Sequence, residues 1–192
     1  MNAPIDFYFD FSSPYGYLAA NRIEALATRH GRGVNWRPML LGVAFKATGS
    51  GPLPSIPLKG DYAKRDFLRS ARFHGVPFNL PQPFPVSTVA ACRAFYSLSD
   101  EKDRVKLAKA LYRAYFVDNV NIGDAANVLK IAHATGLKPE IENQAVKDKT
   151  RAEVDAAIAK GVFGSPYIVV DGEPFWGMDR FDQLERWLQE PF

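Results

Sequence analysis

The order of the predicted strands and helices is the feature of this sequence that most constrains its fold. The segment Ile5 to Phe11 alternates between two faces with a period of two, which is typical of a strand. Ser12-Ser13-Pro14 interrupts the alternation, and apolar residues then recur at helical spacing until Gly31. Val34 to Leu41 predicts a second strand, so the chain begins as strand, helix, strand.

The end of the chain predicts a second group of sheet elements. Ser165-Pro166 precedes the apolar run Tyr167 to Val170, and Asp171-Gly172 is a favourable hairpin turn. Pro174 to Trp176 predicts the returning strand, and a final amphipathic helix follows from Asp179. The chain therefore ends as strand, strand, helix.

The segment between these two groups contains no convincing strand. Gly42 to Pro57 is rich in Gly, Pro and Ser and predicts a loop. Helical spacing and capping residues, including Asp124 as a cap, predict helices over five ranges: Asp61–Phe73, Ser87–Ser97, Asp100–Val117, Asp124–Thr135 and Glu140–Lys160.

This layout predicts an α/β protein with a thioredoxin-like fold, β-α-β followed by β-β-α, and an all-helical domain inserted between its halves. We expect residues 1–57 and 161–192 to form the thioredoxin-like domain and residues 58–160 to form the helical insertion. The chain of 192 residues is long enough to bury a full core without disulfides or metal.

Charge and cysteine content exclude several classes of function. The formal net charge of +3 is too small to imply a nucleic-acid partner, and no apolar run is long enough to cross a membrane. The single cysteine, Cys92, cannot form an internal disulfide or perform dithiol chemistry, which fits a cytoplasmic protein. We expect Cys92 to be a buried structural thiol. The three histidines are scattered, so we expect no metal site.

The turn Ser12-Ser13-Pro14-Tyr15 is a candidate ligand site because it lies between the first strand and the first helix. Ligands of open α/β sheets gather beyond the carboxyl ends of the strands, and a helix N-terminus favours an anion. A purely structural role is also open, because Ser13 before Pro14 is a preferred helix cap. Ser165-Pro166 at the start of the late strand is a weaker indication of a ligand site, since proline is tolerated at the first residue of a strand without any functional role.

Taken together, these motifs resemble 2-hydroxychromene-2-carboxylate isomerases, which are relatives of kappa-class glutathione transferases within the DsbA-like thioredoxin folds. The resemblance covers essentially the whole chain in the right order. It rests on five segments: Asp6 to Leu18, Lys59 to Tyr62, Pro83 to Val86, Gly161 to Pro166 and Phe175 to Arg180.

The resemblance implies a binding site for glutathione. Ser13 occupies the position of the family serine that replaces the first redox cysteine and contacts the glutathione sulfur, with Pro14 and Tyr15 beside it. Pro166 occupies the cis-proline position, and the backbone of Ser165 would pair with the peptide part of glutathione.

The resemblance also assigns residues further from the sulfur. Met178 and Asp179 stand where the family holds the γ-glutamyl end, although Asp179 would equally serve as the cap of the last helix. Lys59 matches a lysine near the substrate pocket and would attract a carboxylate, or it is a plain exposed lysine. Ser50 stands where relatives often have asparagine, and its hydroxyl cannot make the same amide contacts.

The implied chemistry requires glutathione in its thiolate form. Lowering a thiol pKa of about 8.5 by about 2 units requires about 2.7 kcal/mol of differential stabilisation. A hydroxyl that donates to the charged sulfur supplies about 1.5–3 kcal/mol, and a helix N-terminus adds about 0.3–1 kcal/mol. Ser13 would therefore act as a donor to an anion, since no neighbouring base is evident that would make it a nucleophile.

The resemblance implies a glutathione-dependent isomerase of the cis–trans type. The thiolate would add reversibly to a conjugated aromatic keto acid, allow bond rotation and be expelled. Two alternatives stay open: a kappa-like glutathione transferase, which consumes glutathione, and a non-catalytic thioredoxin-fold module that binds a peptide. By analogy with the relatives we also expect a homodimer.

Overall fold

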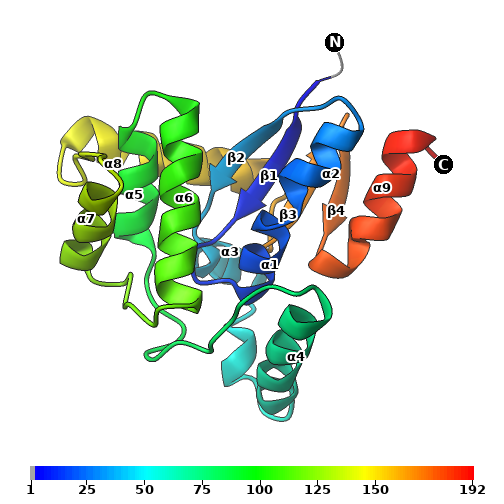
Figure 1. Cartoon of the computed structure of the whole chain (residues 1–192), viewed down its shortest axis with the longest axis horizontal. Coiled ribbons are helices and arrows are strands. Elements are labelled where there is room, and N and C mark those ends of the chain that lie inside the picture. Colours follow the sequence, from blue (N-terminus) through cyan, green and yellow to red (C-terminus); the bar gives the residue numbers. More distant parts are fainter. Residues whose placement is uncertain (1–2) are drawn as a thin grey trace.

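A mixed four-stranded sheet lies at the centre of the computed structural model, which describes residues 3–192 (Figure 1). Residues 1 and 2, the start of the predicted thioredoxin-like domain, lie outside this range. The strand order is β2-β1-β3-β4, with β2 parallel to β1 and both β3 and β4 antiparallel to their neighbours. The strands are β1 (Ile5–Phe9), β2 (Val34–Pro38), β3 (Tyr167–Val170) and β4 (Glu173–Trp176).

Helices cover both faces of this sheet and continue to one side of it. Short 3-10 turns, η1 (Leu53–Ser55) and η2 (Met178–Arg180), precede α4 and α9. The helices are α1 (Pro14–Ala20), α2 (Ile23–Arg29), α3 (Leu41–Thr48), α4 (Lys59–Phe73), α5 (Val89–Ser97), α6 (Glu101–Phe116), α7 (Ala125–Ala134), α8 (Gln144–Ala159) and α9 (Phe181–Gln189).

The period-two alternation of β1 divides the core between the two faces of the sheet. Phe7 and Phe9 belong to the large core that includes residues of α1, α2 and α9. Helices α1 and α2 lie in front of β1 in Figure 1. Tyr8 points to the opposite face, where it joins a smaller core with Ala44 of α3 and Ala157 of α8. The predicted alternation of the first strand is therefore confirmed.

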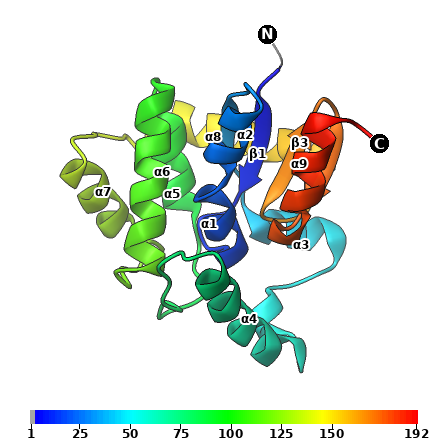
Figure 2. The ribbon, with the colours of Figure 1, turned by 45° about the vertical axis from the view of Figure 1, so that its right-hand side comes forward.

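The larger core runs without interruption from the sheet into the helical segment. The ring of Phe9 lies 6.3 Å from that of Phe95 on α5 and 5.7 Å from that of Tyr112 on α6. Helices α5 to α8 pack together on one side of the sheet, whereas α4 extends away from the other helices (Figure 2). The predicted thioredoxin-like fold with a helical insertion is confirmed, and the two domain boundaries stay a prediction.

Several sequence predictions about elements were wrong. The first strand ends at Phe9 rather than Phe11, and the helix predicted from Glu140 begins at Gln144. The first helix is divided into α1 and α2, which meet at Asn21 and Arg22. The second strand ends at Pro38 rather than Leu41, and α3 occupies half of the segment predicted as a loop. That helix ends at Gly49, whose φ of 69° supplies the left-handed C-terminal cap that glycine favours.

Several smaller expectations can be compared with the structure. Asp124 caps α7 through a 2.9 Å bond from the backbone N–H of Ala126, and Cys92 is fully buried, as predicted.

No helix among residues 3–192 combines the length and hydropathy needed to cross a membrane. Within the same range, no cluster of three metal-ligating side chains forms.

Candidate active site

Ser13 lies where the chain passes from β1 into α1. After Phe9 the backbone turns, and the N–H of Ser13 donates to the carbonyl oxygen of Asp10 at 3.0 Å. Ser13 has extended backbone angles and accepts a 3.0 Å bond from the N–H of Gly16, so it is the N-cap of α1. The capping role expected from the sequence is confirmed, and the Ser13 side chain is only 5% exposed.

The second motif lies directly against the first. The Ser165–Pro166 peptide bond is cis, as the resemblance implies. The hydroxyl of Ser13 donates to the carbonyl oxygen of Ser165 at 2.9 Å, and the N–H of Asp10 donates to the Ser165 hydroxyl at 2.9 Å. Two segments from opposite ends of the chain therefore form one hydrogen-bonded unit.

Gly16 allows this close approach between α1 and the Ser165 loop. A Cβ atom at position 16 would lie 2.6 Å from the Ser165 hydroxyl oxygen and 2.9 Å from the hydroxyl oxygen of Tyr112. Both distances are shorter than real Cβ contacts, so a side chain at this position would force the hydroxyls of Ser165 and Tyr112 to move.

A cavity of about 1060 Å³ opens beside these two motifs. It is large enough for a tripeptide together with a second small molecule, because small-molecule pockets measure about 300–1,000 Å³. The sequence-predicted residues that line it are Ser13, Pro14, Tyr15, Ser50, Ser165, Pro166, Met178 and Asp179. The structure therefore brings nearly all of the predicted site residues to one cavity, while their individual roles stay predictions.

Lys59 is the predicted site residue that does not line this cavity in the described part of the chain. It is exposed at the first position of α4. Lys46 on α3 lines the cavity instead, and no described carboxylate pairs with it. The sequence reasoning missed Lys46 because it treated Gly42 to Pro57 as a loop, although Leu41, Ala44, Phe45 and Thr48 follow helical spacing.

Asp179 is not the cap of the last helix, so that alternative was wrong. It belongs to the 3-10 turn η2, and the N-cap position of α9 is held by Arg180, which makes no side-chain capping bond. The Asp179 carboxylate lies 3.6 Å from the guanidinium of Arg180 at the edge of the cavity.

Most of the cavity wall away from Ser13 is apolar. It combines side chains from α3, η1, α4 and the proline-rich segment before α5, among them Phe45, Ile56, Phe67 and Phe84. Trp176 also lines the cavity and is 56% exposed. Such a wall suits an aromatic or otherwise apolar ligand, since burial of apolar surface is favourable.

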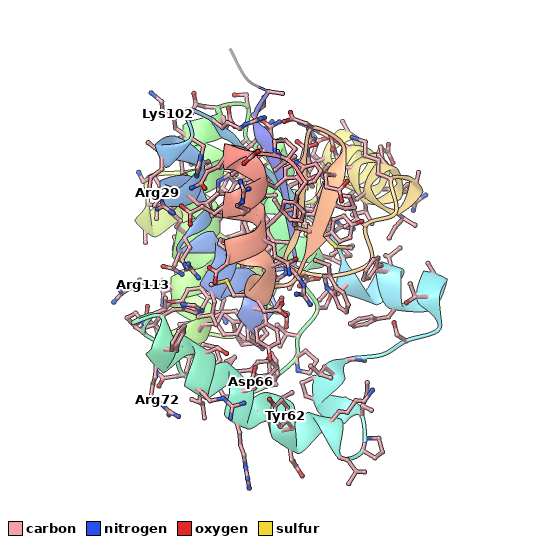
Figure 3. The ribbon with its side chains drawn as sticks, turned by 90° about the vertical axis from the view of Figure 1, so that its right-hand side faces the viewer. Arg29, Tyr62, Asp66, Arg72, Lys102 and Arg113 are labelled. Carbon is pink, nitrogen blue, oxygen red and sulfur yellow. The ribbon has the colours of Figure 1, made fainter. Side chains whose placement is uncertain are left out.

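Helix α4 forms one wall of the cavity and is held to α1 by a hydrogen bond. The Tyr15 hydroxyl donates to the Asp66 carboxylate at 2.5 Å, and Arg69 pairs with the same carboxylate. Burial alone would raise the pKa of Asp66, but the bonds from Tyr15 and Arg69 hold it below its usual value. Figure 3 shows Asp66 and Tyr62 on this helix, beneath the rest of the molecule.

The only sulfhydryl of the chain is not placed to take part in chemistry. Cys92 lies on α5, and its Sγ is 3.7 Å from the carbonyl oxygen of Met39. Burial and the nearby charge of Asp10 raise the pKa of the Cys92 thiol well above its usual range. Since the thiolate is the reactive form, any thiol chemistry in the cavity requires a sulfur that comes from a ligand.

Known proteins are similar to this chain along nearly its whole length. The model of the DsbA-like thioredoxin domain matches residues 4–189. The chain is 31% identical to a 2-hydroxychromene-2-carboxylate isomerase from Sphingobium xenophagum, across 98% of this chain and 99% of that protein. It is 27% identical to glutathione S-transferase kappa 2 from Caenorhabditis elegans, across 98% and 92% of the two chains.

A solved structure of a 2-hydroxychromene-2-carboxylate isomerase superposes with a TM-score of 0.86 at 26% identity, over 96% of this chain and 94% of that one. The chain belongs to the DsbA-like thioredoxin domain family. Within that family it groups with the 2-hydroxychromene-2-carboxylate isomerases and the kappa-class glutathione transferases, which makes it a member of an enzyme group.

Proposed function

We propose that this protein is a glutathione-dependent isomerase of conjugated aromatic keto acids, with Ser13 as the residue that contacts the glutathione sulfur. The observation that carries the proposal is the bond from the Ser13 hydroxyl to the backbone of the cis Ser165–Pro166 segment, beside a cavity of about 1060 Å³. The similarity to isomerases and kappa-class transferases supports the same conclusion.

The residues around Ser13 fit glutathione. The tripeptide carries a thiol, two carboxylates and peptide groups, and the cavity offers a hydroxyl, exposed backbone groups and the charged side chains of Lys46 and Arg180. When bound, glutathione would supply a thiolate that adds reversibly to the substrate and leaves after bond rotation. In this site it would replace the sulfur that the buried Cys92 cannot offer.

Ser13 would stabilise the negative charge on that sulfur. Its hydroxyl proton points to the carbonyl oxygen of Ser165, and rotation about one side-chain bond would direct it into the cavity instead. A hydrogen bond to a charged group contributes about 1.5–3 kcal/mol, which corresponds to about 1–2 units of pKa. Ser13 alone would therefore supply much of the shift that makes a thiolate at neutral pH.

The other predicted residues would orient the tripeptide around Ser13. The backbone of Ser165 before Pro166 would pair with the peptide part of glutathione, and Pro14 and Tyr15 would contact it from α1. Met178 and Asp179 would hold the γ-glutamyl end. All of them line the same cavity as Ser13, which supports these assignments.

The substrate would lie against the apolar side of the cavity formed by α3, η1 and α4. Phe45 and Phe67 would contact its aromatic part, and Lys46 would attract its carboxylate. Ser50, the position at which relatives often have asparagine, lies on the same side and would tune the choice of aromatic acid.

Measurement of free thiol during turnover distinguishes the proposed isomerase from a kappa-like glutathione transferase. The enzyme is incubated with reduced glutathione and a conjugated aromatic keto acid, and both the substrate isomers and the free thiol are followed. We expect many turnovers of isomerisation with no loss of thiol. Stoichiometric loss of thiol would instead identify a kappa-like transferase.

Calorimetric measurement of glutathione binding distinguishes an isomerase or a transferase from a non-catalytic module that binds a peptide. We expect saturable binding of reduced glutathione at millimolar concentration or below, whereas a peptide-binding module would show none. A cytoplasmic location is part of the same proposal, because thiols are held reduced in that compartment. A homodimer is proposed by analogy with the relatives alone. Fractionation of the producing cell and light scattering of the purified protein test these two points.

A further inference from the structure

Asp10 is a buried carboxylate that the proposed function leaves unused. It follows β1, is 4% exposed and lines the polar end of the cavity. Its carboxylate accepts hydrogen bonds from the backbone N–H of Ser12 at 2.8 Å, the backbone N–H of Leu41 at 2.8 Å and the hydroxyl of Thr88 at 3.1 Å. Leu41 begins α3 and Thr88 precedes α5, so Asp10 ties the Ser13 turn to the starts of two further helices.

The hydrogen-bond pattern around Asp10 fits an ionised carboxylate. All three partners donate, and no described side chain accepts a proton from it. Among the described residues no Lys, Arg or His forms an ion pair with this carboxylate. On balance the pKa of Asp10 is raised, because burial outweighs the bonds from Leu41, Ser12 and Thr88, so the ionised form is inferred from the three donors alone.

The groups that face Asp10 from its neighbouring elements are neutral. Thr88 and Cys92 face it from the α5 side, and Tyr112 and Tyr115 face it from α6. Burial raises the pKa of both the Cys92 thiol and the Tyr112 hydroxyl well above their usual ranges, so neither carries charge near neutral pH. In its ionised form, Asp10 would therefore carry a negative charge that no cationic side chain of residues 3–192 pairs with.

Asp10 lies close enough to Ser13 for its charge to act there. The 3.0 Å bond from the Ser13 N–H to the Asp10 carbonyl closes a turn, which brings the two Cα atoms within about 7 Å. Both side chains are buried, so salt screens their interaction far less than an interaction between surface charges.

We propose that Asp10 is a positioning residue whose negative charge sets the acidity of a thiol bound at Ser13. A like charge raises a thiol pKa, so Asp10 opposes the lowering by the Ser13 hydroxyl. These two opposing effects on the thiol pKa have a chemical use. A thiolate becomes a weaker nucleophile as its pKa decreases, so an attacking thiol works best when its pKa is near the ambient pH. Without Asp10 the thiol would ionise more readily but attack less strongly.

A reporter thiol tests this inference without relying on glutathione. The variant Ser13→Cys places a thiol at the position in question, and its pKa is read from the pH dependence of alkylation by iodoacetamide. Peptide masses separate this label from any label on the buried Cys92. The same measurement is then made after adding Asp10→Asn, which removes the charge but keeps a side-chain oxygen that accepts.

We expect the reporter pKa to fall by about one unit when Asp10→Asn is added, because a buried like charge is lost. Thr88→Val is the matched control, since it removes one bond to Asp10 and leaves the charge; we expect it to shift the reporter pKa by less than about a third of that amount. A reporter pKa that stays unchanged or rises in Asp10→Asn overturns the proposal and leaves Asp10 a purely structural residue.

Folding of each variant is checked by circular dichroism. If Asp10→Asn does not fold, Asp10→Ser provides the same comparison, because its smaller hydroxyl still accepts from the Ser12 N–H and carries no charge. The inference about Asp10 rests on the site of the proposed function, but separate experiments can refute the effect of Asp10 and the binding of glutathione. Absence of glutathione binding to the native chain would overturn that function and leave the reporter result intact.

Discussion

The hydroxyl of Ser13 and the carbonyl oxygen of Ser165 meet at 2.9 Å, although 152 positions separate the two residues in the chain. One lies at the start of α1 and the other before β3, and the sheet brings them together because β1 and β3 are neighbours. The ligand site therefore depends on correct pairing of the first strand with the late hairpin.

Replacing Ser13 by alanine separates a capping role from a role in thiol activation. Loss of the cap bond to the Gly16 N–H should lower the free energy of unfolding by about 1 kcal/mol. Loss of the donor to sulfur should lower kcat/KM with glutathione by about 10- to 100-fold. Steady-state kinetics and urea unfolding measure the two effects.

Asn143→Ala is the matched control for Ser13→Ala. Asn143 caps α8 through a 2.9 Å bond from the Ala145 N–H and does not line the cavity in the described structure. We expect a similar loss of stability with unchanged kinetics. If Ser13→Ala retains full activity, Ser13 is a helix cap and nothing more.

Gly16→Ala should destabilise the protein even though alanine favours helix. The new Cβ would lie 2.6 Å from the Ser165 hydroxyl oxygen, which is held by the Asp10 N–H, and 2.9 Å from the hydroxyl oxygen of Tyr112. Overpacking of this kind costs about 1–3 kcal/mol, which exceeds the helix preference of about 1 kcal/mol. Urea unfolding measures the difference.

Gly42→Ala is the control for this substitution. Gly42 lies in the first turn of α3, and a Cβ there meets no atom within 4 Å. We expect its free energy of unfolding to stay equal or rise by up to about 1 kcal/mol. Equal stability of Gly16→Ala and the native protein would show that the Ser165 loop can move away at no cost.

The sequence reveals the parts of this site that depend on local patterns. Alternation identifies β1, the serine before Pro14 identifies the start of α1, and the order of elements identifies the thioredoxin-like fold. The strand and the helix start could be predicted because each is encoded within about ten residues, and the fold follows from the order of such local elements along the chain. Proximity of Ser13 and Ser165 follows from the fold, since strands of that order pair in one sheet.

Features that depend on tertiary contacts could not be predicted in the same way. Helix α3 was missed because three glycines and three prolines dominate the segment from Gly42 to Pro57 and hide the helical spacing of its first half. In the structure Ala44 of this helix lies in the same core as Tyr8, a contact that the sequence does not reveal. The contacts of the Asp10 carboxylate could not be predicted either. Its partners Leu41 and Thr88 are 31 and 78 residues away, so no local pattern identifies them.

The bond between Tyr15 and Asp66 predicts a pH-dependent contribution to stability. The pKa of Asp66 is lower in the folded protein than its usual 3.8, so this contribution is present above about pH 4 and is lost as the pH falls through the folded value. Tyr15→Phe removes the bond from the hydroxyl and should lower the free energy of unfolding by about 1–2 kcal/mol near neutral pH. The difference from the native protein should shrink below about pH 4.

Tyr62→Phe is the control for Tyr15→Phe. Its hydroxyl accepts an exposed bond from Arg69, and we expect a change in stability below about 0.5 kcal/mol. Unfolding in urea over a pH series measures both variants. A Tyr15→Phe deficit that stays constant across the pH series would contradict a role for the Asp66 charge.

Replacement of Lys46 and replacement of Lys59 should have different effects on the binding of an anionic substrate. Lys46 lines the cavity, whereas Lys59 does not among the described residues. Lys46→Met should raise KM for a substrate carboxylate by about 5- to 10-fold with little change in kcat, as expected for loss of uniform binding. Lys59→Met should leave both parameters unchanged, and the reverse pattern would favour the assignment that the family resemblance implies.

The most direct test of the account is the ionisation state of glutathione in the site. Reduced glutathione is titrated into the native protein and into Ser13→Ala at about pH 7, and the ultraviolet absorbance of the thiolate is recorded. We predict a band that saturates with the native protein and is largely lost in Ser13→Ala. Saturable binding without a thiolate band, or an equal band in the two proteins, would contradict the central role of Ser13.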